Sequence, residues 1–428
     1  MTTTASQEVS ATSTDDRDTP RWLARLTGAP GRVMLALISG VLLQLSFPPR
    51  TLWFLAPLAF AGLGLAVYRR RARAGFGYGL VFAVAFFLLH LMWIEDFLGA
   101  GFGSAPWLAL SALQGIFVAL ACAGMAVVQR LPAAPLWMSA LWVGQETLRA
   151  SFPLNGFPWG RAAFSQPSGV FTSLASIGGA PLVSLAVTLC GFGLAWVLVG
   201  VARRTVRLVP AVAFAVVPVL AGLAVWPTIG VDPTRGELTV AIVQGNAPNI
   251  GLDLLSAREE IRANHFATSE RLLADIDAGR VARPDLLVWP ETATAVGDGD
   301  RQLDRLVGRF GVPALIGALY LREDGLTENA VFAWDPDDGR GEHYAKQELV
   351  PFAEYVPWRS IAAWFTPFLD NTTDMRPGDR PGLLSPGGVP VGVLICYEAA
   401  YDYVARETVD GGAELLVVPT NNAWYGPG

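Results

Sequence analysis

The chain has 428 residues, of which 52% are hydrophobic and only 16% are charged, and its mean hydropathy is +0.39. These values exclude a disordered chain, a coiled coil, a collagen and a disulfide scaffold. Residues 1–230 carry 15 Arg and 7 acids, a net charge of +8, whereas residues 231–428 carry 15 Arg, 1 Lys and 30 acids, a net charge of −14. Two environments are therefore predicted, and the acidic second half argues against nucleic-acid binding.

The first 30 residues are rich in Ser, Thr and Asp and are predicted to form a disordered tail. Seven apolar segments follow within residues 31–228, and most are long enough, at roughly 17–25 residues, to cross a bilayer as helices. They lie at about 33–47, 51–68, 75–94, 107–128, 136–150, 181–202 and 208–227. A polytopic helical membrane domain is predicted.

Arginines in the connecting loops predict the orientation of this domain. One set of alternate loops holds 12 Arg and the other set holds 4. The positive-inside rule then assigns the N-terminal tail to the cytoplasm, and seven crossings put residues 229–428 outside it. Within the apolar half, Glu146 and Arg149 are spaced to pair on one helix face, or alternatively to line a lipid-access cavity.

The second half changes to short strands separated by helices. Strands are predicted at 237–243, 285–289, 314–321, 389–395 and 414–418, and helices at 254–278 and 301–310. Pro290 is expected to end the second of these strands. The alternation of strands and helices indicates a layered α/β domain with a largely buried sheet.

Three polar residues in this half stand at or near strand ends, where active-site residues are often found. Glu291 follows the strand at 285–289, Cys396 follows the strand at 389–395, and Lys346 lies between a strand-like stretch and an apolar one. Each also has an ordinary structural interpretation, as a turn or cap carboxylate, a packed thiol and a solvated surface cation.

The lysine is unusual because the chain contains 30 Arg and only this one Lys. A position that remains Lys in such a chain indicates a need for a compact ammonium that a guanidinium cannot imitate. Glu, Lys and Cys together form a coherent nucleophilic set, in which a carboxylate is the base and an ammonium stabilises the thiolate and an oxyanion. A Cys–His arrangement with His343 is the alternative. The other cysteines, Cys122 and Cys190, lie in apolar runs and are predicted to be buried.

Clustered Cys and His residues, as zinc and iron–sulfur sites require, do not occur in the sequence, and the common nucleotide-binding motifs are also missing. Neither a metal nor a cofactor is expected. Chemistry is therefore expected to depend on side chains alone.

Several motifs resemble those of known proteins. Residues 289–291 (WPE), Lys346 with 350–357 (VPFAEYVP), and 396–398 (CYE) resemble the signatures of the carbon–nitrogen hydrolase, or nitrilase-like, superfamily. Together with 156–159 (GFPW), 243–246 (VQGN) and 422–426 (NAWYG), and joined to a multi-span half, they resemble the bacterial apolipoprotein N-acyltransferases.

This resemblance implies a nitrilase-like α-β-β-α sandwich in residues 229–428, on the outer side of the bacterial cell membrane. It implies that Cys396, activated by Glu291, takes an acyl chain from a membrane phospholipid as a thioester, while Lys346 holds the oxyanion. The chain would then pass to the α-amine of a lipoprotein's diacylglyceryl-cysteine. By the same resemblance Glu354, Tyr397 and Glu398 are supporting residues.

Relative to that family the sandwich is expected to be incomplete at its C-terminal end, because only 200 residues follow position 228. Two other functions stay open from the sequence. The first is a membrane-tethered amide hydrolase that uses the same Glu–Lys–Cys set with water as the acceptor. The second is an inactive, truncated membrane scaffold.

Overall fold

The computed structural model describes most of the chain. The described residues are 28–98, 103–204, 208–230, 232–233, 235–247, 257–297, 299–359 and 374–425. They form two compact units, one within Met1–Leu89, Ala112–Gln145 and Arg161–Ile229, and the other within His90–Ser111, Glu146–Gly160 and Gly230–Gly428. The predicted tail lies outside the described residues up to position 27, and the first helix that the structure describes begins at Ala29.

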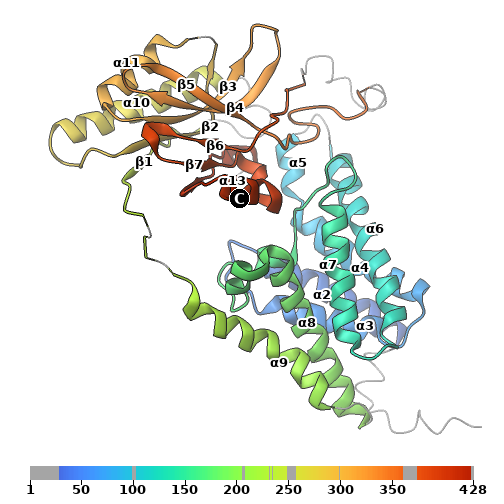
Figure 1. Cartoon of the computed structure of the whole chain (residues 1–428). Helices are drawn as coiled ribbons and strands as arrows, with labels where there is room; N and C mark the ends of the chain where they lie inside the picture. The colour runs from blue at the N-terminus through green and yellow to red at the C-terminus, as the bar shows by residue number, and fades with distance from the viewer. Residues whose placement is uncertain are drawn as a thin grey trace, which may run out of the picture. The chain divides into compact units, whose positions relative to one another are not determined.

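A helix is present at each of the seven predicted apolar segments. The helices are α2 (Ala29–Leu45), α3 (Leu55–Val67), α4 (Ala72–His90), α6 (Ala105–Val128), α7 (Ala134–Arg149), α8 (Ala175–Arg203) and α9 (Leu208–Val225), with a short α5 (Trp93–Leu98) between α4 and α6. They are labelled in Figure 1.

Among the described residues, four helical stretches are long and apolar enough to cross a membrane. They are Ala72–Phe97, Ala105–Val128, Thr172–Arg203 and Leu208–Thr228. Helices α2 and α3 are also apolar, but they have 17 and 13 residues. They therefore rise about 25 and 20 Å, against a hydrocarbon core of about 30 Å. The count of seven crossings stays a prediction.

Glycines of α8 allow close packing of helices in the first unit. A Cβ atom at Gly191 would lie 2.5 Å from the carbonyl oxygen of Pro57 in α3, and one at Gly193 would lie 2.5 Å from the backbone nitrogen of Ala215 in α9. Small residues at helix interfaces let backbones approach in this way in membrane bundles.

The described residues of the second unit form two β-sheets. The larger has the order β1 (Val240–Ile242), β2 (Leu286–Val296), β3 (Ala314–Leu321), β4 (Thr327–Asp335), β5 (Gly339–Ala345), parallel from β1 to β3 and antiparallel from β3 to β5. The smaller has the order β6 (Leu383–Leu384), β7 (Val391–Val393), β8 (Leu415–Val417). Mixed sheets of this kind carry helices on their outer faces.

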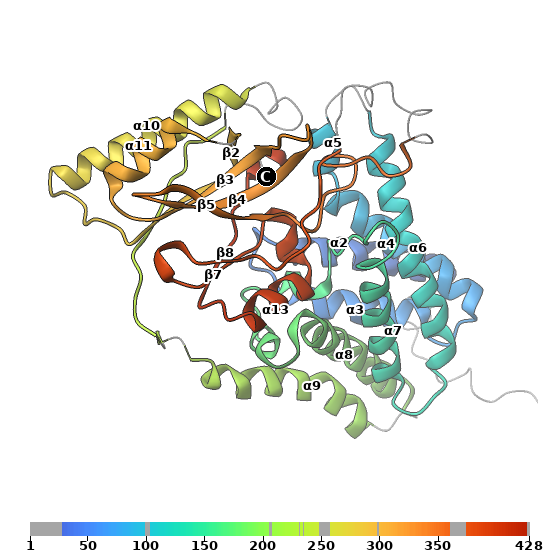
Figure 2. The same cartoon turned by 45° about the horizontal axis from the view of Figure 1, so that its top comes forward.

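Alternate side chains of the larger sheet enter two different cores. Leu287 and Trp289 pack in one core with residues of α10 (Arg258–Asp277) and α11 (Arg301–Phe310). Figure 1 shows these two helices along the larger sheet. Leu286 and Val288 face the smaller sheet instead. The outer face of that sheet packs against α13 (Asp402–Asp410), which is visible in Figure 2. This is the predicted α-β-β-α sandwich.

The prediction that the strand at 285–289 ends at Pro290 is wrong. Strand β2 continues to Val296, and its register with β3 shifts between Trp289 and Thr294. The strand tolerates the proline because the ladder is already irregular there. Gly317 of β3 makes room for it, since a Cβ at that position would lie 2.0 Å from the carbonyl oxygen of Pro290.

Other elements agree with the predictions or extend them. Helix α11 and strand β3 have the predicted limits, and α10 covers the predicted helix from residue 258 onward, with 254–256 outside the described residues. Strands β4 and β6 were not predicted from the sequence. Strand β4 matters for function because it supplies a residue to the site described next.

Candidate active site

Lys346 lies at the centre of a buried cluster of charged and amide side chains. It follows the last residue of β5, and its backbone N–H donates to the carbonyl oxygen of Asn329 on β4 at 2.8 Å. Its Nζ is 3.3 Å from Glu291 Oε1 and 3.0 Å from Glu354 Oε1, and only 1% of the residue is exposed. Lys346 is therefore not a solvated surface cation.

Two opposing effects act on this lysine. Burial alone would lower the pKa of Lys346, because it disfavours the charged form. The negative charges of Glu354 and Glu291, and of Cys396 when it is a thiolate, outweigh burial and raise the pKa of Lys346 well above its usual value. The side chain is an ammonium held by its anionic neighbours.

Glu291 lies at the irregular part of β2 and is 3% exposed. Its Oε1 accepts hydrogen bonds from Lys346 Nζ and from Asn329 Nδ2, the latter at 2.8 Å. Its Oε2 accepts one from the backbone N–H of Asn421, which follows β8, at 3.1 Å. A carboxylate has about four acceptor positions, so these three donors leave one position on Oε2.

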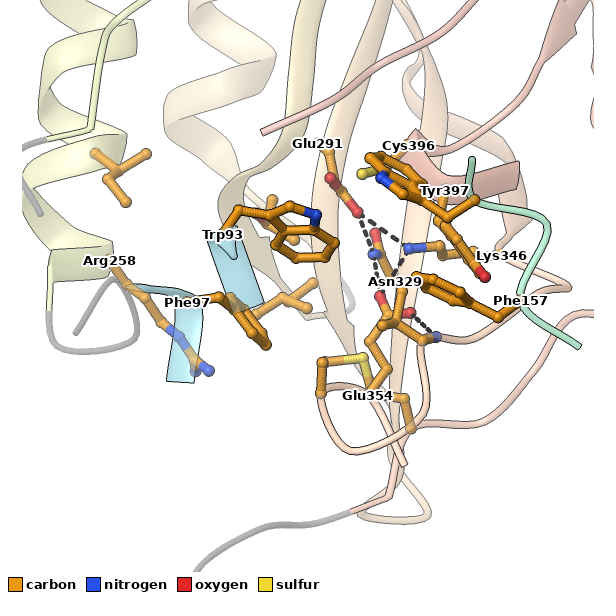
Figure 3. Close-up of a pocket in the computed structure, with 17 residues that line it drawn as sticks. Trp93, Phe97, Phe157, Arg258, Glu291, Asn329, Lys346, Glu354, Cys396 and Tyr397 are labelled. Atoms are coloured by element: carbon orange, nitrogen blue, oxygen red, sulfur yellow. Dashed lines mark hydrogen bonds and ion pairs between the residues drawn. The ribbon is translucent and has the colours of Figure 1, made fainter. Parts of the chain in front are cut away.

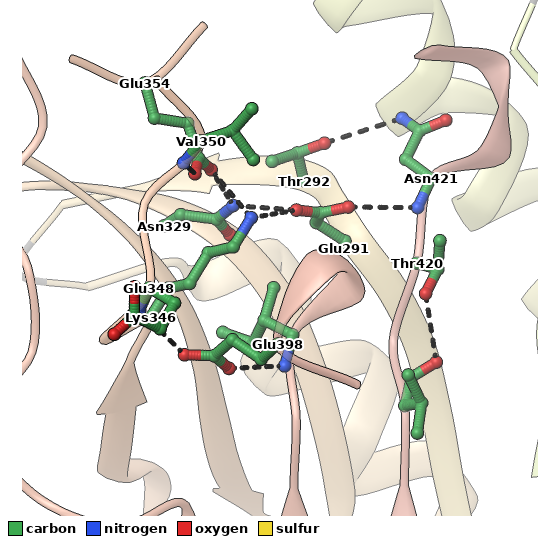
Figure 4. A network of polar contacts seen from close by, with 12 residues as sticks. Glu291, Thr292, Asn329, Lys346, Glu348, Val350, Glu354, Glu398, Thr420 and Asn421 are labelled. Carbon is green, nitrogen blue, oxygen red and sulfur yellow. Dashed lines mark hydrogen bonds and ion pairs between the residues drawn. The ribbon is translucent and has the colours of Figure 1, made fainter. Parts of the chain in front are cut away.

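Asn329 connects the two carboxylates of the cluster, as Figure 4 shows. Its Nδ2 lies 2.8 Å from Glu291 Oε1 and 2.7 Å from Glu354 Oε1, and the residue is 2% exposed. The amide group thus bridges two carboxylates, which as like charges repel each other around a single lysine. The sequence reasoning missed Asn329. The only available signal was a polar pair, Glu328-Asn329, at the start of an apolar stretch.

The loop after Lys346 holds Glu354 in place. The Oε2 atom of Glu354 accepts a hydrogen bond from the backbone N–H of Val350 at 2.8 Å, and the Glu354 N–H returns one to the Val350 carbonyl oxygen at 2.9 Å. Within this turn Phe352 has a left-handed φ of 65°. The turn orients the Glu354 carboxylate toward Lys346.

Cys396 lies at a sharp turn after β7 and is half-buried, whereas Cys122 and Cys190 are buried. Its φ of 54° is in the left-handed region, which costs a non-glycine residue roughly 1 kcal/mol or more. The backbone N–H of Cys396 donates to the carbonyl oxygen of Pro419 at 3.0 Å. The surrounding bonds thus maintain a strained conformation that leaves the thiol accessible.

Glu398 connects the Cys396 turn to the Lys346 loop. It is fully buried, and it accepts hydrogen bonds from the N–H groups of Gln347 and Ile395, both at 2.7 Å, and from the Tyr344 hydroxyl at 2.8 Å. Burial raises the pKa of Glu398, while these hydrogen bonds act in the opposite direction. The carboxylate fixes the relative positions of the two loops.

Aromatic side chains form one wall of the pocket that contains the cluster. We call these residues the aromatic wall: Trp93, Phe97, Phe157, Trp159 and Tyr397. Tyr397 stacks on Phe157 and Trp159, with ring centroids 6.2 and 6.4 Å apart. Figure 3 shows wall residues beside Cys396, Glu291 and Lys346. The pocket therefore joins an apolar surface to a charged cluster.

Arg149 holds the loop that supplies two residues of the aromatic wall. Its Nη1 donates to the carbonyl oxygens of Phe157 at 3.2 Å and Trp159 at 2.5 Å, and the residue is 1% exposed. The pairing of Arg149 with Glu146, and the alternative of a lipid-access cavity, stay predictions.

The alternative base, His343, lies elsewhere. Its Nε2 is 3.2 Å from Glu328 Oε2, and its ring stacks on Phe332 with centroids 4.9 Å apart. It is not among the residues that line the pocket with Cys396. In the part of the chain that the structure describes, no three His, Cys, Asp or Glu side chains lie together as metal ligands would.

Comparison with known proteins identifies the family. Residues 39–193 match the apolipoprotein N-acyltransferase N-terminal domain, and residues 239–428 match the carbon–nitrogen hydrolase domain. The chain is 37% identical to an apolipoprotein N-acyltransferase of Mycolicibacterium smegmatis, covering 94% of this chain and 73% of that protein. It is 32% identical to one of Azotobacter vinelandii, covering 95% and 80%. The chain belongs to the apolipoprotein N-acyltransferase family.

Family membership confirms the resemblance inferred from the motifs and makes the chain an acyltransferase with a carbon–nitrogen hydrolase domain. With its apolar helices, it is a membrane protein. Among solved structures, a carbon–nitrogen hydrolase from Helicobacter pylori G27 is 16% identical, with a TM-score of 0.30 over 43% of this chain and 59% of that one.

Proposed function

We propose that the chain transfers an acyl group from a membrane phospholipid to the α-amine of a lipoprotein's N-terminal diacylglyceryl-cysteine, through a thioester on Cys396. One observation carries the proposal: an accessible cysteine shares an aromatic-walled pocket with a buried lysine that two carboxylates hold. An apolar wall suits acyl chains, and the charged cluster suits acyl transfer.

In the first step Glu291 accepts the thiol proton of Cys396, and the sulfur attacks the ester carbonyl carbon of the phospholipid. Oε2 is the acceptor we assign, because Oε1 already receives two donors. The Lys346 ammonium stabilises the tetrahedral oxyanion. The carbon–oxygen bond then breaks, and the departing lysophospholipid alkoxide takes the proton from Glu291.

In the second step the lipoprotein amine attacks the thioester carbonyl carbon. A carbon–nitrogen bond forms, the carbon–sulfur bond breaks, and Glu291 transfers the amine proton to the departing thiolate. Glu354 and Glu398 act as positioning residues, the first by holding Lys346 and the second by linking its loop to the Cys396 turn. Tyr397 contributes to the aromatic wall.

We further propose a multi-pass arrangement with the N-terminus in the cytoplasm and the catalytic domain outside it. This rests on the excess of arginines in one set of loops. Labelling of single cysteines introduced at exposed loop positions in intact cells, in a chain with its native cysteines replaced, tests it. Labelling of a site in residues 229–428 only after cell lysis would contradict it.

The function can be tested with the purified chain in phospholipid vesicles that contain a diacylated lipopeptide. We expect mass spectrometry to detect the lipopeptide with one additional amide-linked acyl chain, and an acyl adduct on Cys396 when the lipopeptide is left out. Free fatty acid without acylated peptide would instead indicate a hydrolase. No adduct and no product would favour an inactive scaffold.

Replacement of Asn329 by alanine is expected to slow acyl-enzyme formation about 10- to 100-fold, because two buried carboxylates each lose a charge-assisted hydrogen bond. Stopped-flow measurement of thioester formation checks the rate.

The matched control for this variant is Glu328→Gln, at the neighbouring position of β4. Glu328 is hydrogen-bonded to Arg322 and His343 and does not line the pocket. We expect its rate to stay within about twofold of wild type. An Asn329→Ala rate within about twofold of wild type would contradict the role assigned to Asn329.

A further inference from the structure

The pocket has a second cation that the reaction steps above do not use. Among the described residues, two basic ones line it, Lys346 and Arg258. The charge of Lys346 is balanced by Glu291 and Glu354. Arg258, in contrast, is exposed and forms no salt bridge with any residue that the structure describes. Its positive charge is therefore available to an anionic ligand in the pocket.

Arg258 is carried by a well-packed helix. It is the first residue of α10, and Ile261, three positions later, lines the same pocket, so this face of the helix is directed toward it. Farther along α10, the ring of Phe266 packs edge-on against that of Trp289, with the centroids 5.2 Å apart. Ser269 accepts a hydrogen bond from the Trp289 indole N–H at 3.1 Å. Since Trp289 and Glu291 belong to the same strand, the sheet sets the separation between Arg258 and the cluster.

The two ends of the pocket differ in charge. The cluster end contains two carboxylates and one ammonium, a net charge of about −1 when all are ionised. The other end contains the Arg258 guanidinium beside Phe97, and Trp93 lies between Arg258 and the cluster in Figure 3. An anionic ligand group is thus favoured at Arg258 and disfavoured next to Glu291 and Glu354.

We propose that Arg258 binds the phosphodiester of the phospholipid acyl donor. This inference rests on the proposed function. An ester carbonyl at Cys396 and a phosphate at Arg258 would place the donor along the pocket with its glycerol part against the aromatic wall. Guanidinium groups bind phosphate oxygens through paired, charge-assisted hydrogen bonds.

The test measures binding, so it does not depend on catalysis. The probe is an ether-linked phosphatidylethanolamine, which has the phosphate but no cleavable ester, and its partner is the corresponding ether-linked glycerolipid without phosphate. Titration of the full chain in detergent, followed by tryptophan fluorescence, gives the Kd of each. The variants are Arg258→Gln and Arg258→Lys, with Arg271→Gln as the control that removes the same charge from an exposed position of α10 outside the pocket.

We expect Arg258→Gln to weaken binding of the ether phospholipid about 10- to 100-fold and to leave binding of the phosphate-free lipid within about twofold. The Kd of Arg258→Lys for the ether phospholipid should lie between those of wild type and Arg258→Gln. The Kd of Arg271→Gln should resemble that of wild type. Unchanged phospholipid binding by Arg258→Gln, or an equal loss for both lipids, would overturn the proposal. Glycerol phosphate binding as tightly as the lipid would overturn the assignment to a lipid phosphate. If Arg258→Gln weakens binding of the phospholipid alone while the wild-type chain acylates no lipopeptide, the proposed function is wrong and the phosphate site at Arg258 is still supported.

Discussion

Cys396→Ser is expected to reduce acyl transfer by about three orders of magnitude or more, because a serine hydroxyl at neutral pH is a far weaker nucleophile than a thiol with an adjacent base. The step that is slowed should be formation of the acyl-enzyme. The single oxygen-for-sulfur exchange keeps the side-chain shape, so the strained turn with its φ of 54° should be retained. Single-turnover measurement of lysophospholipid release checks the rate.

Two other cysteines provide matched controls for this variant. Cys122→Ala and Cys190→Ala alter buried thiols outside the pocket and should retain at least about half of the wild-type rate. The melting temperature of Cys396→Ser should stay close to wild type. A Cys396→Ser protein that acylates at more than about a tenth of the wild-type rate would contradict the assignment of Cys396 as nucleophile.

Lys346→Arg is expected to lower acyl transfer at least about 100-fold, although the positive charge is kept. The ammonium is 1% exposed and lies within 3.3 Å of both carboxylates. A planar guanidinium is larger, and forcing it into this space costs about 1–3 kcal/mol in packing. The displaced cation would no longer lie where the oxyanion develops. Steady-state kcat/KM with phospholipid and lipopeptide measures the loss.

Lys346→Met removes the positive charge, whereas Lys346→Arg keeps the charge and changes the shape of the side chain. Comparison of the two variants therefore separates the effect of charge from that of geometry. Lys346→Met leaves two buried carboxylates without their cation, which is expected to cost about 3–5 kcal/mol of stability, observed as a lower melting temperature. Arg280→Lys is the surface control, because its salt bridge with Asp275 is exposed. Activity of Lys346→Arg within about twofold of wild type would show that the single lysine of the chain is incidental.

The candidate residues for chemistry could be selected from the sequence because each stands near the end of a predicted or strand-like segment. Glu291, Lys346 and Cys396 were selected on that ground, and Lys346 also because it is the one lysine among 30 arginines. The structure brings all three into one pocket. Their catalytic roles stay predictions that the variants above test.

The partners of these residues could not be read in the same way. Asn329 belongs to β4, which the sequence reasoning did not predict, and its contacts join residues 38 and 25 positions away. Trp93, Phe97, Phe157 and Trp159 come from the apolar half of the sequence, yet they line the same pocket as Cys396, which belongs to the acidic half. Local periodicity contains no information about such long-range neighbours.

The sequence alone determined the two-part composition, the seven apolar helices, the alternation of strands and helices, and the candidate nucleophile, base and cation. These are properties of local order and composition, which the chain carries wherever it folds. Only the tertiary structure decided that β2 continues past Pro290, that Asn329 bridges Glu291 and Glu354, and that Glu398 joins the Cys396 turn to the Lys346 loop. Those features depend on which backbone and side-chain groups meet across the sheets, and hydrogen bonds and charges act only at that short range.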